Sequence, residues 1–320
     1  MQKIHVIHEN DEWTAPLLEA LEDRGLPYEN WFLDRGTLDL STAPPDGVFY
    51  NRMSASSHTR GHRYSPEYAA SVLAWLEAHG RRVLNPGRAL NLELSKVAQY
   101  AALEAHGIRT PRTVAVVGTD GLAAAAESIG APFITKHNRA GKGLGVRLFN
   151  SIAELKDYVS SAEFEAPVDG ITLIQEYIDA PEPFITRCEF VGQEFLYAVR
   201  VDTSDGFLLC PADECQIDDG AGCPTLPKSK FEIIRDFDDP IVNDYRRVLQ
   251  ASDIHIAGIE FIVDRQGNRY TYDINTNTNY NPQAEAKAGR SGMQAIAHLL
   301  CRELAANGYR GSGVPCAAVV

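Results

Sequence analysis

Glu260, Asp273 and Asn275 are the residues of this sequence whose types and spacing best fit metal chemistry. They lie in the stretch 257–281, where two runs rich in β-branched and aromatic residues flank a Gln-Gly turn, a pattern typical of a β-hairpin. Two carboxylates and an amide oxygen suit Mg²⁺ that is bound together with substrate phosphates. The alternative is a solvated hairpin whose acidic face touches only water. Asparagine at every second position from 275 to 281 favours a site.

The register of this hairpin decides whether the two carboxylates meet. If Asp264 pairs with Arg269 across the turn, Glu260 lies opposite Asp273. The amide two residues further on then lies on the same face, opposite Gly258, which has no side chain to fill the space. Opposed carboxylates repel each other, so we expect a cation between them.

A second group of residues could bind phosphates. Residues 131–149 read as a strand, a glycine-rich loop and a second strand, which is neither a P-loop nor a dinucleotide-binding fingerprint. The backbone N–H groups of such a loop could close over phosphates, and Lys136 would supply positive charge. Lys96 lies in the first turn of a helix predicted over 94–106, where its charge opposes the helix dipole; it is either used by the site or simply solvated. The glycines of the loop are Gly141, Gly143 and Gly145.

Two arginines could lie beside this group. The segment 185–201 is predicted to be a hairpin that turns over Gly192 and Gln193. A turn centred there places Arg187 and Arg200 nearly opposite each other, so both could reach one anion. Ordinary surface arginines are the alternative.

Composition excludes several classes of protein. The chain has 320 residues and a net charge of −13, whereas nucleic acids and anionic membranes require a basic face. No stretch approaches the roughly 18 apolar residues of a membrane span, and the amino terminus lacks an apolar signal region; we expect a cytoplasmic protein. Six cysteines are too few for a disulfide scaffold. Because no C-x-x-C pair occurs, Cys210, Cys215 and Cys223 are expected to be free thiols rather than zinc ligands.

The order of elements indicates a small α/β domain ahead of the residues described above. Residues 1–90 alternate between predicted strands and helices, which implies a mostly parallel sheet. Polar residues 51–54 and the basic residues 60–63 follow strand ends, and could clamp a substrate carboxylate. Residues 202–230 show no periodicity and form a long acidic loop, either a border of the acceptor site that favours an amine-bearing partner or a disordered insertion.

The order of these motifs along the chain resembles that of the ATP-grasp superfamily. The motifs are the two lysines, the glycine loop, Gln-Glu-Tyr-Ile at 175–178, Arg187 and the acidic hairpin. The resemblance covers roughly residues 90–300 and is closest to the RimK-type and glutathione-synthetase-type ligases. It implies an α/β fold in which two α+β subdomains grip ATP, after a small parallel α/β domain. The implied division is 1–94 for the first domain, 95–178 for the lid subdomain, 179–310 for the subdomain with the metal site, and 311–320 for a tail.

The resemblance also implies a role for each candidate residue. Phosphates would be held by Lys96 and Lys136 under the loop of Gly141, Gly143 and Gly145. The adenine would be read at the hinge formed by Gln175, Glu176, Tyr177 and Ile178. Magnesium, or manganese in its place, would be bound by Glu260, Asp273 and Asn275. The transferred phosphoryl group and the acyl phosphate would be stabilised by Arg187 and Arg200.

The sequence departs from the RimK type at three places. An acidic residue often precedes the arginine by two positions, whereas this chain has Ile185, so Glu182 is the substitute candidate for ribose contact. The basic loop of RimK is replaced by the acidic segment 210–222. The two metal carboxylates occur in reversed lengths, glutamate first and aspartate second.

The activity implied is ATP-dependent joining of a carboxylate to an amine through an acyl phosphate, releasing ADP and phosphate. The partners implied are a small molecule or peptide bearing the carboxylate and an amine, with neither nucleic acid nor membrane; an oligomer of identical chains stays open. Two rivals also stay open: a phosphotransferase on the same fold, and an ATP-binding regulatory protein without turnover.

Overall fold

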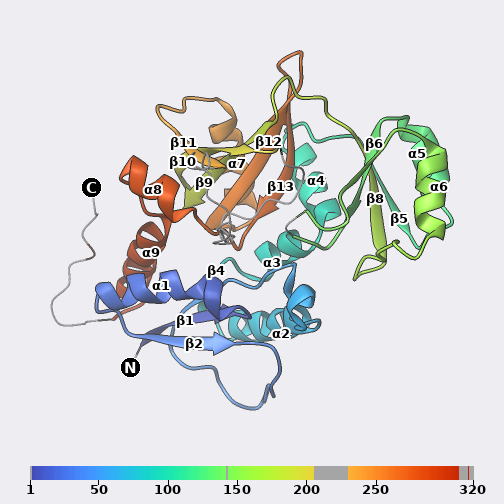
Figure 1. The fold of residues 1–320 in the computed structure, drawn as a ribbon. Coiled ribbons are helices and arrows are strands. Elements are labelled where there is room, and N and C mark those ends of the chain that lie inside the picture. Colours follow the sequence, from blue (N-terminus) through green and yellow to red (C-terminus); the bar gives the residue numbers. More distant parts are fainter. Residues whose placement is uncertain (1, 142, 205–229, 310–315, 317–320) are drawn as a thin grey trace, which may run out of the picture.

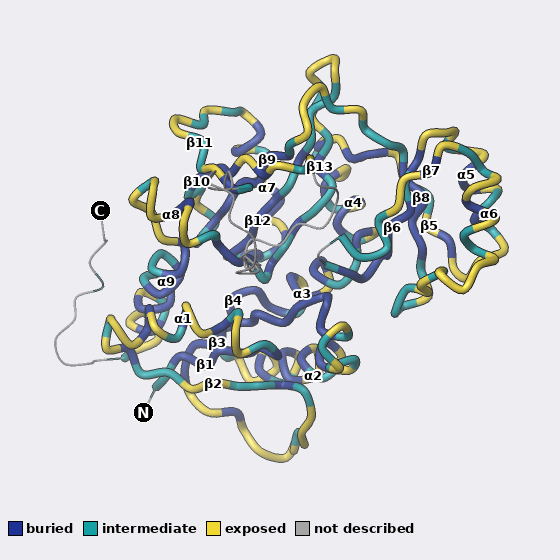
Figure 2. The backbone as a smooth tube through the Cα atoms, viewed as in Figure 1, coloured by how far each residue is buried: buried dark blue, intermediate teal, exposed yellow. Residues whose placement is uncertain are grey.

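The computed structural model describes residues 2–141, 143–204, 230–309 and 316, and three β-sheets organise this part of the chain (Figure 1). The first lies nearest the amino terminus, the second forms a protruding lobe, and the third carries the acidic hairpin. Figure 2 shows that the strands of the first sheet are largely buried, whereas the outer helices of the lobe are exposed.

The first sheet is parallel, as predicted for residues 1–90, with strand order β2-β1-β3-β4. Helices α1 and α2 pack against it, and Asn10 begins α1 by accepting a hydrogen bond from the backbone of Trp13. The segments that follow β1 and β3 reach the cavity described below. The elements are β1 (Lys3–His8), α1 (Asp11–Asp23), β2 (Tyr28–Phe32), β3 (Gly47–Asn51), the short 3-10 helix η1 (Ser57–Arg60), α2 (Ser65–Ala78) and β4 (Arg82–Leu84).

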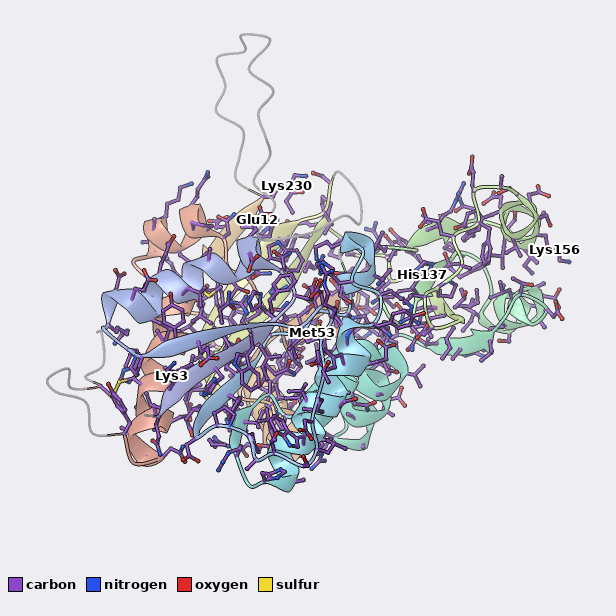
Figure 3. The ribbon with its side chains drawn as sticks, turned by 90° about the horizontal axis from the view of Figure 1, so that it is seen from below. Lys3, Glu12, Met53, His137, Lys156 and Lys230 are labelled. Carbon is purple, nitrogen blue, oxygen red and sulfur yellow. A yellow bond between two sulfur atoms is a disulfide. The ribbon has the colours of Figure 1, made fainter. Side chains whose placement is uncertain are left out.

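The second sheet is antiparallel, with order β5-β8-β6-β7, and has its own core beneath α5 and α6. The predicted strand, glycine loop and strand are confirmed as β6, the loop and β7. Figure 3 places Lys156, on α6, at the far edge of this lobe and His137 near its junction with the rest. The elements are β5 (Thr113–Val117), α5 (Leu122–Ile129), β6 (Phe133–His137), β7 (Arg147–Phe149), α6 (Ile152–Ser160) and β8 (Ile171–Glu176).

The third sheet is antiparallel, with order β11-β10-β9-β12-β13. Apolar residues of α3, α4 and α7 cover one face, and α8 and α9 pack against part of the other. The elements are α3 (Gly87–Leu94), α4 (Lys96–Ala105), β9 (Phe184–Val191), β10 (Glu194–Asp202), β11 (Phe231–Ile234), α7 (Ile241–Ala251), β12 (Ile256–Val263), β13 (Arg269–Asn275), α8 (Pro282–Ala288) and α9 (Gly292–Ala306).

The helix predicted over 94–106 is two helices. Its first residue, Leu94, is the last of α3, a helix that the sequence did not predict. Ser95 is extended, with φ −140°, and its side chain accepts a hydrogen bond from the backbone N–H of Ala98, so it begins α4. Lys96 is therefore the first residue of α4, as expected.

Helix α9 links the first and third sheets. It packs against α1, β1, β3 and β9, so one apolar cluster runs through all of them. Its Cys301 forms a disulfide with Cys316, which the sequence did not predict, and Cys188 is a buried free thiol. The other three cysteines and most of the predicted acidic loop at 202–230 lie outside the described residues, and the proposed domain boundaries remain predictions.

Among the described helices, none is both long enough and apolar enough to cross a membrane.

Candidate active site

A cavity of about 430 Å³ lies between the second and third sheets, and segments that follow β1 and β3 close its first-domain side. This volume is in the range of small-molecule sites. Most of the predicted site residues line it: Lys96, Lys136, Gly141, Gly143, Gln175, Glu176, Tyr177, Ile178, Arg187, Glu260, Asp273 and Asn275. Gly145 and Arg200 are not among the lining residues.

The acidic hairpin has the predicted pairing of Glu260 with Asp273, but reaches it differently. Val263, not Asp264, pairs with Arg269, because the turn is one residue longer than expected. Uncorrected, this shift would turn the aspartate to the other face. A β-bulge beside Glu260 inserts one extra residue in β13 and restores the carboxylate pair.

Arg187 is the cation nearest to Glu260. It lies opposite Glu260 on β9, and its Nη1 is 2.9 Å from Glu260 Oε1. Its Nε donates to Glu189 at 2.5 Å, and its Nη2 donates to Thr278 Oγ1 at 2.5 Å. The space above Gly258 is occupied by this guanidinium, since a Cβ there would lie 2.4 Å from Nη2. Glycine at 258 is thus required for the arginine to lie flat on the sheet.

The two lysines lie on the other side of the carboxylates. Lys96 forms an ion pair with Asp273. Lys136 Nζ donates to the backbone carbonyl of Tyr272 at 3.2 Å and lies 5.0 Å from the centre of that ring. Burial lowers the pKa of Lys136, although Asp273 and Glu260 oppose the effect. Burial would raise the pKa of Asp273, but Lys96 and Lys136 outweigh it and hold that pKa below its ordinary value.

The predicted metal ligands fit a hard cation that completes its shell elsewhere. Glu260, Asp273 and Asn275 lie on one face of the hairpin. The buried Nδ2 of Asn275 has no hydrogen-bond partner among the described residues, so this amide is not committed to the protein. No cluster of three or more acidic, histidine or cysteine side chains suited to a metal occurs in the described part of the chain. Phosphate or water oxygens would have to supply the remaining ligands.

The glycine loop contributes two of its three predicted glycines to the cavity. Gly143 has a φ of +74°, which favours glycine. Gly145 supports the loop structure instead. Its φ is +71°, and a Cβ there would lie 2.2 Å from the ring of His137. Its backbone carbonyl accepts a hydrogen bond from Thr135 Oγ1 at 2.9 Å. The loop is also fastened to α2, where Arg139 Nη1 lies 2.7 Å from Glu67 Oε1.

The predicted adenine hinge follows β8 along the cavity wall. The side-chain Nε2 of Gln175 donates hydrogen bonds to the hydroxyl groups of Tyr100 and Thr113, at 2.9 and 2.8 Å. Glu176 accepts a 2.7 Å hydrogen bond from the backbone N–H of Arg112 through one carboxylate oxygen. Direct contact of these two side chains with adenine remains a prediction.

The prediction that Arg187 and Arg200 share one face is wrong. A β-bulge near Leu196 in β10 shifts the register, so that Arg200 pairs with Thr186 instead of Ile185. Successive residues of a strand point to opposite faces, and Arg200 therefore points away from Arg187. Its side chain is 44% exposed, 2.8 Å from Glu182. Arg200 is not retained as a catalytic candidate.

The proposed basic clamp of the first domain is also not free to act. Arg60 donates two hydrogen bonds to the buried Glu9, at 2.6 and 3.1 Å, and His62 lies 3.0 Å from the same carboxylate. Arg63 is paired with Glu67 at 2.8 Å. These side chains hold the first domain together, and no local pattern in the sequence revealed their acidic partners.

Sequence reasoning missed Glu93, a buried residue of α3 that lines the cavity. Its Oε2 accepts hydrogen bonds from the backbone N–H groups of Thr276 and Asn277, at 2.7 and 3.4 Å, and its Oε1 accepts from Ala55 at 3.3 Å. Burial raises the pKa of this carboxyl group, although Lys96 opposes the effect. Glu93 thus fastens the segment after β13 to the first domain. Its place in an amphipathic helix gave no signal of this contact.

Three comparisons with known proteins agree on the class. The solved structure of ATP-grasp ligase PsnB complexed with a minimal precursor superposes with a TM-score of 0.65 at 18% identity, covering 94% of this chain and 99% of that one. The D-alanine–D-alanine ligase of Chromohalobacter salexigens is 28% identical over 177 residues, 55% of this chain and 51% of that protein. A probable alpha-L-glutamate ligase of Xanthomonas euvesicatoria pv. vesicatoria is 28% identical over 140 residues, 43% of this chain and 46% of that protein. The chain spans about half the length of the curated relatives it matches.

The chain shares the fold of that ATP-grasp ligase structure, and its cavity lies between two of the sheets. Residues 94–208 match the RimK-like ATP-grasp domain. This match agrees with the resemblance to the RimK type.

Proposed function

We propose that this protein is an ATP-dependent ligase that joins a carboxylate to an amine and releases ADP and phosphate. The observation that supports this most is the meeting of two facing carboxylates with three cations in one cavity, beneath a glycine loop. The carboxylates are Glu260 and Asp273, and the cations are Lys96, Lys136 and Arg187. The matched relatives bear the names of ligases, which agrees with the proposal.

The reaction needs cations that neutralise charge on the transferred phosphoryl group. Lys136 and the loop at Gly141 and Gly143 would hold the nucleotide phosphates. Arg187 would stabilise the charge that develops as the phosphoryl group moves to the substrate carboxylate. The cavity walls would keep water from the acyl phosphate until the amine attacks.

A magnesium ion is the metal we propose for Glu260, Asp273 and Asn275, because all three offer oxygen ligands. When bound, such an ion supplies neutralisation of phosphate charge. Lys96 and Arg187 would then leave the carboxylates that they now contact and turn to the phosphates. In this proposal the cationic side chains lie where the negatively charged phosphates of the nucleotide would bind.

The test is an ADP-release screen over amino acids and short peptides, run with and without hydroxylamine. A ligase is expected to release ADP with at least one acid and to form its hydroxamate, since hydroxylamine traps an acyl phosphate. A stable phosphorylated hydroxyl product without hydroxamate would identify a phosphotransferase. ATP binding without ADP release in every reaction would contradict both enzyme activities.

Asp273→Asn is expected to reduce Mg²⁺-dependent ADP release by about two orders of magnitude or more, because it removes a charge directed at the phosphates. The fold should persist, as judged by circular dichroism. Asp244→Asn is the matched control, since the side chain of Asp244 on α7 is 40% exposed and forms a surface ion pair with Arg247. Wild-type ADP release by Asp273→Asn would refute the proposed role of the hairpin.

A further inference from the structure

Arg52 is a buried guanidinium without an acidic partner. Arg52 directly follows β3 and is only 2% exposed, yet it forms no ion pair with any described residue. An unpaired buried charge is costly and requires other polar contacts. Arg52 finds them in the segment between β13 and α8, far away in sequence.

The oxygen contacts of Arg52 are with side-chain amides and a backbone carbonyl, and its Nη1 also lies 3.8 Å from Met293 Sδ. Its Nη2 donates to Asn279 Oδ1 at 2.9 Å and to the carbonyl of Thr278 at 3.4 Å, and its Nε donates to Asn277 Oδ1 at 3.2 Å. Arginine has five donors and no acceptor. The two asparagines must therefore turn their oxygen atoms towards Arg52.

The fixed oxygens determine what the cavity wall presents. Asn277 and Asn279 both line the cavity, and their Nδ2 groups have no hydrogen-bond partner among the described residues. Because the oxygen ends face Arg52, the NH₂ ends are the polar ends left for a ligand. The wall at this point consists of hydrogen-bond donors, with the unneutralised charge of Arg52 behind them. Such a wall attracts carboxylate or carbonyl oxygens and disfavours ammonium groups.

The donor wall also lies beside the proposed point of phosphoryl transfer. Thr278, between the two asparagines, accepts a 2.5 Å hydrogen bond from Arg187 Nη2 and donates one to Glu189 at 2.8 Å. Glu93, on α3, accepts a hydrogen bond from the backbone N–H of Asn277. The segment is thus fastened from β3, from α3 and from β9.

We propose that Asn277 and Asn279 bind oxygen atoms of the acid substrate through their Nδ2 groups, and that Arg52 is the positioning residue that fixes them in this orientation. This inference rests on the proposed function and assigns the acid, not the amine, to the wall between the first domain and β13. The substrate class is an acid whose carboxylate, or a carbonyl next to it, accepts hydrogen bonds from two amides.

The test compares binding of acids with that of their matched primary amides. The probes are the twenty L-amino acids and their primary amides, with ADP present, and the dissociation constants come from ligand-observed NMR. The wild-type protein is expected to bind at least one acid more tightly than its amide. Asn277→Asp and Asn279→Asp should each weaken binding of that acid by about ten- to hundredfold, because an acceptor oxygen replaces the donor. Binding of the matched amide should weaken much less. ADP affinity should not change.

Asn281→Asp is the matched control. Asn281 caps α8 by accepting from the backbone of Ala284, and aspartate caps a helix equally well, so the variant adds the same charge without altering the wall. Arg52→Met frees both amides and should reduce the ratio of acid to amide affinity, whereas Arg52→Lys should restore part of it. A role of Arg52 in stability alone would leave that ratio unchanged.

Three results would overturn the donor wall. The first is an unchanged ratio of acid to amide affinity in both Asn277→Asp and Asn279→Asp, and the second is an equal change of that ratio in Asn281→Asp. The third is a wild-type protein that binds ADP but no acid of the panel. The ligase proposal is judged separately, by hydroxamate formation. Acids that bind with the expected preference but give no hydroxamate contradict the ligase and leave the wall standing. Hydroxamate formation together with an unchanged ratio of acid to amide affinity in the aspartate variants contradicts the donor wall but agrees with the ligase proposal.

Discussion

At the scale of single residues, the charges of the cavity are paired with one another and so are held ready for a ligand. Arg187 contacts Glu189, Glu260 and Thr278, and Lys96 contacts Asp273. Buried cations and anions that satisfy one another avoid the cost of isolated charge. An anionic nucleotide with its metal ion could exchange with these pairs without leaving any group unpaired.

Gly258→Ala is expected to reduce kcat/KM by about a hundredfold, because a Cβ 2.4 Å from Arg187 Nη2 must displace the guanidinium by roughly an ångström. Steady-state ADP release measures the effect. Gly87→Ala is the control: its Cβ would meet only Glu77, at 3.4 Å, on the surface of the first domain. Full activity of Gly258→Ala would mean that Arg187 need not lie on the sheet.

Lys136→Ala is expected to weaken ATP binding by roughly 1.5–3 kcal/mol, the usual loss for a hydrogen bond to a charged group. Adenosine binding should hardly change, because the residue is proposed to contact phosphate. Isothermal titration with both ligands measures the difference, and Lys156→Ala on the outer face of the lobe (Figure 3) is the control. Equal losses for ATP and adenosine would place Lys136 elsewhere than the phosphate site.

At the scale of elements, irregular strands and one interdomain ion pair arrange the site. A bulge in β13 brings Asp273 to the face of Glu260, and a bulge in β10 takes Arg200 away from it. Bulges redirect side chains next to functional sites. The glycine loop is fixed to α2 by the pair of Arg139 and Glu67, so the lid of the cavity is linked to the first domain.

The pair of Arg139 and Glu67 predicts a pH dependence. Partial burial would raise the pKa of Glu67, but hydrogen bonds from Arg139 and Arg63 lower it to about 2 from the ordinary 4.5. A carboxyl group with a depressed pKa in the folded state stabilises the fold above its unfolded-state pKa, and this stabilisation is lost as pH falls towards the folded-state value.

The urea midpoint of the wild type should therefore exceed that of Glu67→Gln at pH 7, and the gap should close between about pH 4.5 and pH 2. Glu163→Gln, in a surface pair with Arg147, should show little gap at any pH. A gap for Glu67→Gln that persists at pH 2 would contradict the role of its charge.

At the scale of the whole molecule, α9 joins the first and third sheets into one apolar core, whereas the second sheet has a core of its own. The lobe thus has a largely separate core, although Leu173 of β8 also packs in the cluster beneath the third sheet. The cavity lies at the meeting of the three sheets, which is where movement of the lobe would change its access.

Leu300→Ala is expected to cost about 2–5 kcal/mol of unfolding free energy, because Leu300 is fully buried in the shared core. Hydrogen exchange should show loss of protection in the first and third sheets together. Leu155→Ala, in the core of the lobe, should cost protection mainly in the second sheet. Loss confined to the first sheet in Leu300→Ala would show that α9 does not couple the two.

The sequence by itself determined those features that depend on local patterns. Alternating strands and helices predicted the first sheet, and the glycine turn at Gly267, with φ +83°, predicted the hairpin that carries Glu260 and Asp273. The order of the lysines, glycine loop and acidic hairpin along the chain carried the resemblance to the ATP-grasp superfamily, because motif order can be read directly from the sequence. The amphipathic pattern of residues 292–306 is likewise local, and α9 spans the same residues.

The tertiary structure alone decided the features that depend on contacts between distant segments. Turn position and strand direction predict that Arg200 faces Ile185, yet one extra residue in β10 reverses its face, since the side-chain period of a strand is two. No local pattern reveals that Arg52 meets Asn277 and Asn279, more than two hundred residues away, because burial of its charge is satisfied only where β3 and the end of β13 meet. The orientation of those amides, and with it the chemistry of the cavity wall, follows from that meeting.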